Sequence, residues 1–168
     1  MPAWQAREDG AATLLALHGP YSDYAAALDA RELQRWSGFF TEDGVYKLQS
    51  RENFDRGLHL ATMAFESRGM LHDRVYGAQQ TTFYDSYVQR HIVSLPRLLA
   101  RVVTVQGDVL CCEASYLVVR TKRYGMPEIL SMGRYLDRVV FTPDGLRFAQ
   151  RLAIFDNDLI PNSIIDPI

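Results

Sequence analysis

The histidines are the first residues to test for metal chemistry, and their spacing does not favour a shared site. The chain has four of them: His18, His59, His72 and His91. A mononuclear iron site of the two-histidine-one-carboxylate kind needs ligands that converge around open positions. His59 and His72 are 13 residues apart, in the least regular part of the sequence. We therefore favour surface or loop histidines over a metal site, and no phosphate-binding glycine loop or Gly-x-Ser-x-Gly elbow is present.

The dipeptide Arg90-His91 could take part in acid–base chemistry. A histidine buried beside a carboxylate can serve as a general base near neutral pH. In this functional interpretation His91 would lie inside a pocket, where its acid and its orienting group would come from Tyr21, Asp23 and Tyr24.

A structural interpretation of the same residues is favoured over the catalytic one. Neighbours on a strand point to opposite faces, so Arg90 and His91 cannot both line one pocket. Arg90 and Arg74 would instead pair with carboxylates in a buried or interface network. The candidate partners are Asp73, Asp85 and Asp137.

A series of arginines recurs on the predicted strands of the C-terminal half. Arginine offers a planar fork that suits carboxylates and backbone carbonyls, as in a permanent polar interface. A solvated sheet face remains the alternative. The series comprises Arg120, Arg134, Arg138, Arg147 and Arg151.

Composition limits the class of protein. The chain has 168 residues, a length that predicts one domain. Its formal charge is −2 and its pI is near 6.1, so nucleic acid and anionic membranes are not favoured as partners. No apolar stretch approaches the ~20 residues that span a bilayer. Residues 1–10 carry Glu8 and Asp9 and do not resemble a signal peptide. Adjacent Cys111 and Cys112 would point to opposite faces of a strand, which favours reduced thiols and a cytoplasmic protein.

The N-terminal part predicts helices that position the candidate pocket residues. Residues 1–13 are expected to be flexible, and 14–80 to hold helices and a first strand at 45–49. A short helix near Leu14 should end or kink at Gly19-Pro20. A second carries Tyr21, Tyr24, Ala25 and Leu28 on one face. Asp29 and Glu32 have the spacing of a capping box that would open a third helix, and a further helix is predicted at 70–78.

The C-terminal part predicts an antiparallel sheet over 88–156. Turn residues at 106–108, 124–127 and 142–145 separate apolar runs at 109–123, 129–141 and 146–155. Another strand at 89–95 should end at Pro96. Both faces of 109–120 are substantially apolar, so we expect both to be covered. The tail at 157–168 should be extended and lie across the sheet or against another subunit. The whole predicts one α+β domain with a curved sheet closed over by helices.

An ordered set of motifs resembles one family over about residues 14–168. It is similar to the small (beta) subunits of Rieske-type aromatic-ring-hydroxylating oxygenases, above all those serving benzoate-type acids such as salicylate 5-hydroxylases and terephthalate dioxygenases. One departure is Leu95-Pro96-Arg97 after Ser94, where many members carry Ser-Asn. The motifs are Tyr24 to Asp29, Trp36, Phe39 to Tyr46, Asp73-Arg74-Val75, Arg90-His91, Val93-Ser94, Tyr116, Val118-Val119-Arg120, Gly133-Arg134-Tyr135, Asp137, Leu146-Arg147-Phe148, Arg151 and Asp156.

The resemblance implies a fold and a role. The fold would be a cone, a strongly bent antiparallel sheet with helices across its mouth, as in ketosteroid isomerase and scytalone dehydratase. The chain itself would be non-catalytic and bind no cofactor, because it lacks the Cys-x-His and Cys-x-x-His pairs of a Rieske site. A large (alpha) subunit would hold the [2Fe-2S] cluster and the mononuclear iron, in a ring of three large and three small subunits that receives electrons from NAD(P)H through a reductase.

Five residues are predicted to lie at subunit interfaces of that ring: Arg74, Arg90, His91, Arg134 and Arg151. Two hypotheses from other classes stay open. One is a stand-alone cone-shaped dehydratase or isomerase with His91, Asp23 and Tyr21 in its pocket, and the other is a small-molecule binding module. Shape alone does not separate these functions.

Overall fold

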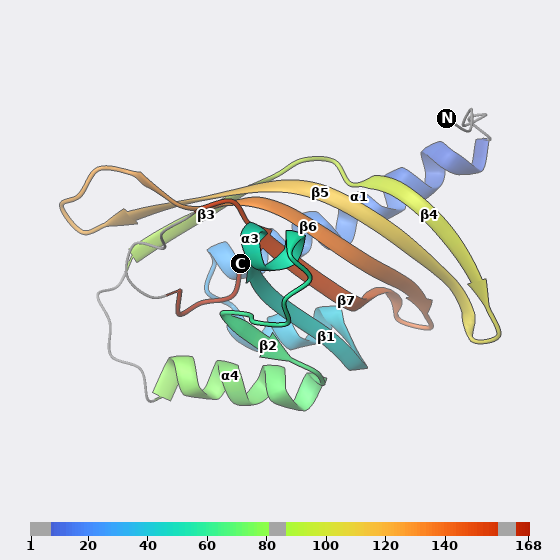
Figure 1. The fold of residues 1–168 in the computed structure, drawn as a ribbon, viewed down its shortest axis with the longest axis horizontal. Coiled ribbons are helices and arrows are strands. Elements are labelled where there is room, and N and C mark those ends of the chain that lie inside the picture. Colours follow the sequence, from blue (N-terminus) through green and yellow to red (C-terminus); the bar gives the residue numbers. More distant parts are fainter. Residues whose placement is uncertain (1–7, 81–86, 158–163) are drawn as a thin grey trace.

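A single curved sheet organises the chain. The computed structural model describes residues 8–80, 87–157 and 164–168, and within them the sheet has seven strands, with α1 behind it and α3 in front of it in Figure 1. The helical elements are α1 (Glu8–Asp29), α2 (Leu33–Trp36), η1 (Ser37–Phe39), α3 (Arg51–Asp55) and α4 (Arg68–Gln80). The strands are β1 (Phe40–Ser50), β2 (Met63–Phe65), β3 (Tyr87–Val93), β4 (Arg97–Thr104), β5 (Gly107–Lys122), β6 (Glu128–Thr142) and β7 (Gly145–Phe155).

The strand order confirms the predicted α+β fold with a curved, mainly antiparallel sheet. The order is β2-β1-β7-β6-β5-β3, and β4 also pairs with β5. Only the β1–β7 pair is parallel among the described strands. The long strand β5 pairs with β4 along its first half and with β3 along its second half. The three predicted turns connect β4 to β5, β5 to β6, and β6 to β7.

The first helix continues through Gly19-Pro20, where the sequence predicted that a short helix would end or kink. Pro20 lies inside α1, which runs without interruption from Glu8 and so also includes part of the stretch expected to be flexible. An internal proline costs roughly 3 kcal/mol because it removes a hydrogen bond and crowds the preceding turn. Burying one large apolar side chain contributes about 1.5–3 kcal/mol, so several on one face outweigh that cost. The buried side chains of this face include Leu17, Tyr21, Tyr24 and Leu28.

The end of α1 corrects the predicted capping box. Asp29 is the last residue of α1, and the residue that precedes α2 is Glu32, whose side chain makes no capping hydrogen bond. The helix ends because Arg31 takes a positive φ of 57°. The Glu32 N–H then donates to the Ala27 carbonyl at 2.8 Å, and the Arg31 N–H to the Leu28 carbonyl at 3.0 Å. These two bonds form a Schellman motif, which leaves the Asp29 carboxylate free to reach the sheet.

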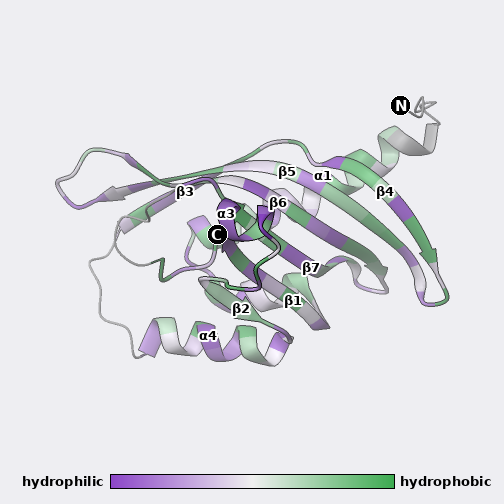
Figure 2. Cartoon of the chain, viewed as in Figure 1, coloured by the Kyte–Doolittle hydropathy of each residue, from purple (hydrophilic) through white to green (hydrophobic). Residues whose placement is uncertain are grey.

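One face of the sheet forms the core and the other is only partly covered. On β5 one face is buried against the core, as shown by Leu110, Ala114 and Val118, all at most 2% exposed. The opposite face is half-buried at Leu117 and Val119 and exposed at Ser115. The sequence predicted that both faces of this strand are covered. Within this chain, only the face that packs on the core is fully covered. Figure 2 shows the resulting mixture of hydrophobic and hydrophilic residues along these strands.

Gly133 is required where β6 and β7 approach each other closely. A Cβ built at Gly133 would lie 1.9 Å from the carbonyl oxygen of Ile154 on the neighbouring strand. We expect Gly133→Ala to lower the free energy of unfolding by roughly 1–3 kcal/mol, because the backbone of β7 must shift to admit the methyl group. Urea unfolding measures this. Gly38→Ala is the control, since nothing lies within 4 Å of its Cβ position. Equal stability of the two variants would contradict the close approach.

Candidate functional site

An arginine–aspartate pair occupies the interior of the cone. Asp137 on β6 and Arg151 on β7 are directly opposite each other in the strand register. The Arg151 Nε donates to Asp137 Oδ1 at 3.1 Å and Nη2 donates to Oδ2 at 2.8 Å. Both side chains have an exposed fraction of 0%. This two-pronged geometry holds both charges where solvent cannot reach them.

Aromatic rings enclose the guanidinium of Arg151. Its Cζ atom lies 3.9 Å from the ring centre of Phe148, 4.1 Å from Tyr24, 4.2 Å from Tyr135 and 4.8 Å from Tyr21. Such distances are within the range of cation–π attraction, which is strongest for a desolvated cation. The part of the interior around Arg151 is therefore filled by side chains of this chain.

Electrostatics leave this cluster poorly suited to proton transfer near neutral pH. Burial raises the pKa of Tyr21, Tyr24 and Tyr135 above the ordinary tyrosine value. For Arg151, burial alone would lower the pKa, but the charge and hydrogen bonds of Asp137 raise it well above its usual value. The tyrosines thus stay neutral and the arginine stays charged across the physiological range.

Residues 164–168 close the cluster from the helix side. Ile168 is buried, and its carbonyl accepts hydrogen bonds from Tyr24 Oη at 3.0 Å and Tyr46 Oη at 3.2 Å. Trp36 Nε1 donates to the same Tyr24 hydroxyl at 3.0 Å. The described part of the tail therefore packs into the chain's own core, and the predicted contact of the tail with another subunit stays a prediction. Residues 158–163 lie outside the described residues.

His91 clamps the end of α1 to the sheet through Asp29. Its Nδ1–H donates to Asp29 Oδ1 at 2.7 Å, and its backbone N–H donates to the two carboxylate oxygens at 3.0 and 3.1 Å. The His91 side chain has an exposed fraction of 0% and that of Asp29 11%. Nearby, Gln89 Nε2 donates to the Leu28 carbonyl at 3.1 Å. These bonds join β3 to α1 at two successive inward positions.

The structure brings together two of the three residues of the catalytic hypothesis, His91 and Tyr21, but not Asp23. Asp23 is exposed on α1, and Tyr21 packs against Arg151. His91 and Tyr21 do line one hollow of about 260 Å³ beside α1. The buried Nε2 of His91 and the buried hydroxyl of Tyr21 have no hydrogen-bond partner among the described residues. Asp29, which sequence reasoning assigned to a cap, is the carboxylate that His91 contacts.

Replacing Asp29 tests the clamp. We expect Asp29→Asn to lower the free energy of unfolding by about 1–3 kcal/mol, because the side chain loses its negative charge and an NH2 donor replaces Oδ2, which accepts from the His91 backbone N–H. Urea unfolding gives the stability, and hydrogen exchange at the His91 amide should become faster. Asp23→Asn, an exposed position on the same helix, should stay within about 0.5 kcal/mol of the parent chain. Unchanged exchange at His91 in Asp29→Asn would contradict the assignment.

The remaining predicted interface arginines divide between the interior and the surface. Arg74 donates to the Ile165 carbonyl, and Arg90, with a side chain 70% exposed, lies 3.8 Å from Asp29. Arg134 lies 3.7 Å from Glu113 and stacks over Phe54. Of the predicted partners of Arg74 and Arg90, Asp137 pairs with Arg151 instead, whereas Asp85 lies outside the described residues and its pairing stays a prediction. The interface assignment itself stays a prediction.

The predicted arginine series does not share one face. Arg120 and Arg151 are buried, whereas Arg138 is exposed. Arg120 Nε donates to Glu128 at 2.8 Å. The series therefore serves two purposes: some members hold the interior together, and others remain at the outer surface.

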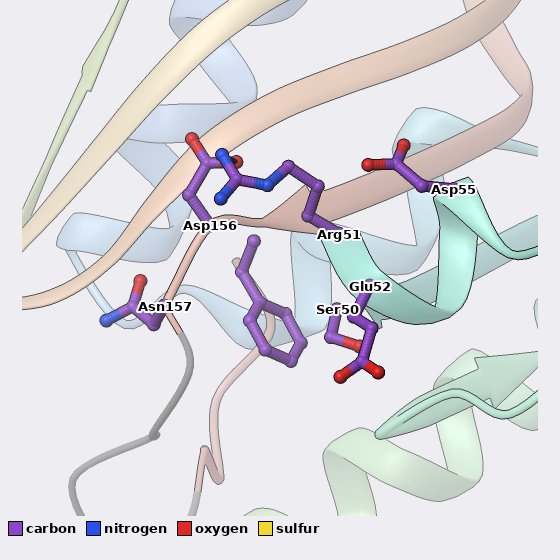
Figure 3. Close-up of a pocket in the computed structure, with 7 residues that line it drawn as sticks. Ser50, Arg51, Glu52, Asp55, Asp156 and Asn157 are labelled. Atoms are coloured by element: carbon purple, nitrogen blue, oxygen red, sulfur yellow. Dashed lines mark hydrogen bonds and ion pairs between the residues drawn. The ribbon is translucent and has the colours of Figure 1, made fainter.

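A hollow of about 270 Å³ lies between the start of α3 and the end of β7 (Figure 3). It is lined by Glu52, Asp55 and Asp156, but Asp156 accepts a hydrogen bond from Arg51 at 3.3 Å and Glu52 one from Arg56 at 2.8 Å. Throughout residues 8–80, 87–157 and 164–168, no three His, Cys, Asp or Glu side chains stand where they could hold a metal ion. His72 instead bonds to the hydroxyl of Ser37, at 3.2 Å from its Nε2.

Comparison with known proteins places this geometry in a family. The SnoaL-like domain family matches residues 11–152. The chain is 34% identical over 145 residues to the small subunit of anthranilate 1,2-dioxygenase from Burkholderia cepacia, covering 86% of this chain and 88% of the relative. It is 29% identical over 147 residues to a beta subunit of the terminal oxygenase component of terephthalate 1,2-dioxygenase from Comamonas sp, covering 86% and 92%.

A solved structure agrees with these relatives. A chain assigned as the beta subunit of an aromatic-ring-hydroxylating dioxygenase from Novosphingobium aromaticivorans superposes with a TM-score of 0.84 at 30% identity, covering 96% of this chain and 100% of the other. Fold, identity and coverage agree along nearly the whole length. The chain therefore belongs to the SnoaL-like family and, within it, to the small subunits of aromatic-ring-hydroxylating dioxygenases.

Proposed function

We propose that this chain is the non-catalytic small subunit of an oxygenase that hydroxylates a benzoate-type aromatic acid. Its work is to bind a large subunit that holds the Rieske cluster and the mononuclear iron. The names of the relatives point to aromatic carboxylic acids, anthranilate and terephthalate, as the substrate class. Salicylate, suggested by the sequence resemblance, is one acid of this class to assay.

The observation that carries the non-catalytic assignment is the filled cone. An enzyme of this shape needs room for a substrate beside its catalytic groups, and here Arg151, Asp137 and the surrounding rings take up that interior. The His91–Asp29 pair is committed to holding α1 on β3. These contacts support a scaffold over the rival dehydratase or isomerase with His91, Asp23 and Tyr21.

The proposed assembly is a ring of three large and three small subunits that receives electrons from NAD(P)H through a separate reductase. A scaffold contributes to catalysis by holding the cluster of one large subunit near the iron of the next, which is a proximity effect. A cytoplasmic location is part of this proposal. No described helix is both long enough and apolar enough to cross a membrane.

Of the five predicted interface residues, we propose that Arg90 and Arg134 contact partner subunits directly. Their side chains are 70% and 41% exposed. Arg74, His91 and Arg151 bond within the chain, and we propose that they support the interface by fixing the elements beneath it.

Co-expression tests the proposal. The affinity-tagged chain is expressed with the product of the neighbouring reading frame that carries Cys-x-His and Cys-x-x-His. We expect the two chains to co-purify as one complex that hydroxylates an aromatic acid when the reductase and NAD(P)H are added. The tagged chain expressed by itself is the control and should be folded and inactive. Failure of the two chains to co-purify, or dehydratase or isomerase turnover by the lone chain, would overturn the proposal.

A further inference from the structure

The outer surface at one end of the sheet is apolar, and the described residues of the chain leave it uncovered. We call it the β3–β5–β6 face, after the strands that build it. Strand register places Ile92, Leu117 and Met132 in one row across β3, β5 and β6, and Arg90, Val119 and Ile129 in the next. Val88 extends the same side of β3. Residues in register on neighbouring strands point to the same side of a sheet, so these seven side chains form one surface.

The exposed fractions show that the described residues leave this face open. Val88 is 60% exposed, Ile92 61%, Ile129 52% and Met132 45%. Residues on the other side of the same strands, such as Val118 and Leu130, are at most 2% exposed because they face the core. At this end of the sheet an apolar inner side is thus matched by an apolar outer side. A bare apolar patch of this kind marks an interaction site in a soluble protein.

The outer face is covered elsewhere by the chain itself. Over β1 and β7 lies α3, and there the outward side chain of Ile154 is 0% exposed. Phe54 of α3 packs against Arg134, which borders the β3–β5–β6 face. The outer face of the sheet is thus covered by α3 over β1 and β7 but exposed over β3, β5 and β6. This contrast indicates that another chain covers the β3–β5–β6 face.

Charge indicates the chemistry of that other chain. Arg90 stands within the apolar rows with its side chain 70% exposed and its guanidinium 3.8 Å from Asp29, and Arg134, 41% exposed and 3.7 Å from Glu113, borders them. The nearby carboxylates of Glu113 and Glu128 already pair with arginines of this chain. The surface therefore presents cations among apolar side chains, and its complement is an apolar surface with free carboxylates.

A second copy of this chain fits the face poorly. A two-fold contact would bring the same patch of both copies together and collect Arg90 and Arg134 of both copies in one interface, where like charges cost free energy. The other large group of exposed apolar residues, Val102, Val103 and Val105 on β4 and its turn, is flanked by Arg97 and Arg101. The carboxylates beside that group, Glu113 and Asp108, already pair with Arg97 and Arg101, so a head-to-tail contact between the two groups would offer Arg90 no unpaired carboxylate.

We propose that the β3–β5–β6 face is the surface on which the large subunit docks, with its apolar rows buried and Arg90 paired to a carboxylate of the partner. This inference rests on the proposed function, that the chain binds a large subunit. Ile92 and Ile129 form the centre of the contact, and Arg90 sets its charge preference.

Binding of the purified large subunit to immobilised variants tests the site. We expect the double variant Ile92→Glu/Ile129→Glu to raise the Kd for the large subunit at least tenfold. We expect Arg90→Glu to raise the Kd as well, and the Kd of this variant should depend less on salt concentration than that of the parent chain. Val103→Glu is the matched control: its side chain is 78% exposed on β4, and its Kd should equal that of the parent chain. All changed side chains are exposed, so thermal unfolding should show intact folds. Should the double variant not fold, Arg90→Glu alone decides.

The outcomes separate this inference from the proposed function. If the parent chain does not bind the large subunit at all, the proposed function fails. If the parent chain binds and Arg90→Glu and the double variant bind equally well, the docking site is wrong. Loss of binding in Val103→Glu alone would move the contact to β4. A double variant that keeps its affinity for the large subunit but loses self-association in sedimentation would assign the face to a second copy and overturn the inference.

Discussion

Asp137→Asn is expected to lower the free energy of unfolding by about 3–5 kcal/mol, because it leaves the charge of Arg151 buried without its counter-ion. Both side chains are fully buried and joined by two hydrogen bonds. Chemical unfolding by urea, followed by far-UV circular dichroism, measures the loss. A loss of this size is a large share of the 5–15 kcal/mol that stabilises an ordinary domain.

A double replacement separates the charge from the packing. Asp137→Leu/Arg151→Met should recover most of the stability, because apolar side chains of similar size remove both charges and still fill the aromatic enclosure. Asp108→Asn, which breaks the partly exposed pair with Arg101 on the same sheet, should change stability by no more than about 1 kcal/mol. A double variant as unstable as Asp137→Asn would contradict the assigned role of the pair.

Alkaline pH is expected to unfold the chain steeply. Burial, as the largest cause, raises the pKa of five tyrosines above 10 in the folded chain: Tyr21, Tyr24, Tyr46, Tyr116 and Tyr135. In the unfolded chain each ionises near its ordinary pKa of about 10. The folded state then binds more protons, so stability is fully present below pH 10 and falls as the pH rises above it. Each tyrosine contributes up to about 1.4 kcal/mol per pH unit, and the five together up to about 7 kcal/mol per pH unit, enough to unfold the domain within about two units.

Absorbance at 295 nm and far-UV circular dichroism, recorded over the same titration, check this expectation. The tyrosinate signal of the buried groups should rise together with the loss of secondary structure. Tyr135→Phe supplies a matched variant, since the Tyr135 hydroxyl has no hydrogen-bond partner among the described residues. It should fold normally and reduce the slope by about 1.4 kcal/mol per pH unit. Ionisation of the buried tyrosines with the fold intact would contradict their desolvation.

The sheet could be predicted from sequence because its turns contain glycine and proline, whose backbone preferences mark turns. Gly107 and Gly145 both take positive φ, as their turns require. The predicted strands at 109–123, 129–141 and 146–155 lie within one or two residues of β5, β6 and β7. The bounds of the edge strand β4 were not predicted. Most of its residues are exposed, and its apolar residues come in short runs, so apolar and polar residues do not alternate along it.

The interior pairs could not be read from sequence for two different reasons. Counting back from the β6–β7 turn at Thr142 and Gly145 would place Leu136 opposite Arg151. A bulge after Arg138 shifts the register by one residue and brings Asp137 there instead. Asp29 was hidden because its contact with His91 joins a helix end to a strand 62 residues later. Local patterns record neither a bulge nor a packing angle.

Element-specific iron and sulfide analysis of the separated chains tests the central claim most directly. The claim is that this chain works by being held in a larger assembly and performs no chemistry itself. The purified oxygenase would be resolved into its two chains under conditions that keep the cofactors bound. The account predicts that iron, labile sulfide and oxygenase turnover depend on the large chain, with none found on this one. Stoichiometric iron on this chain, or product formed by it without the large chain, would contradict the account.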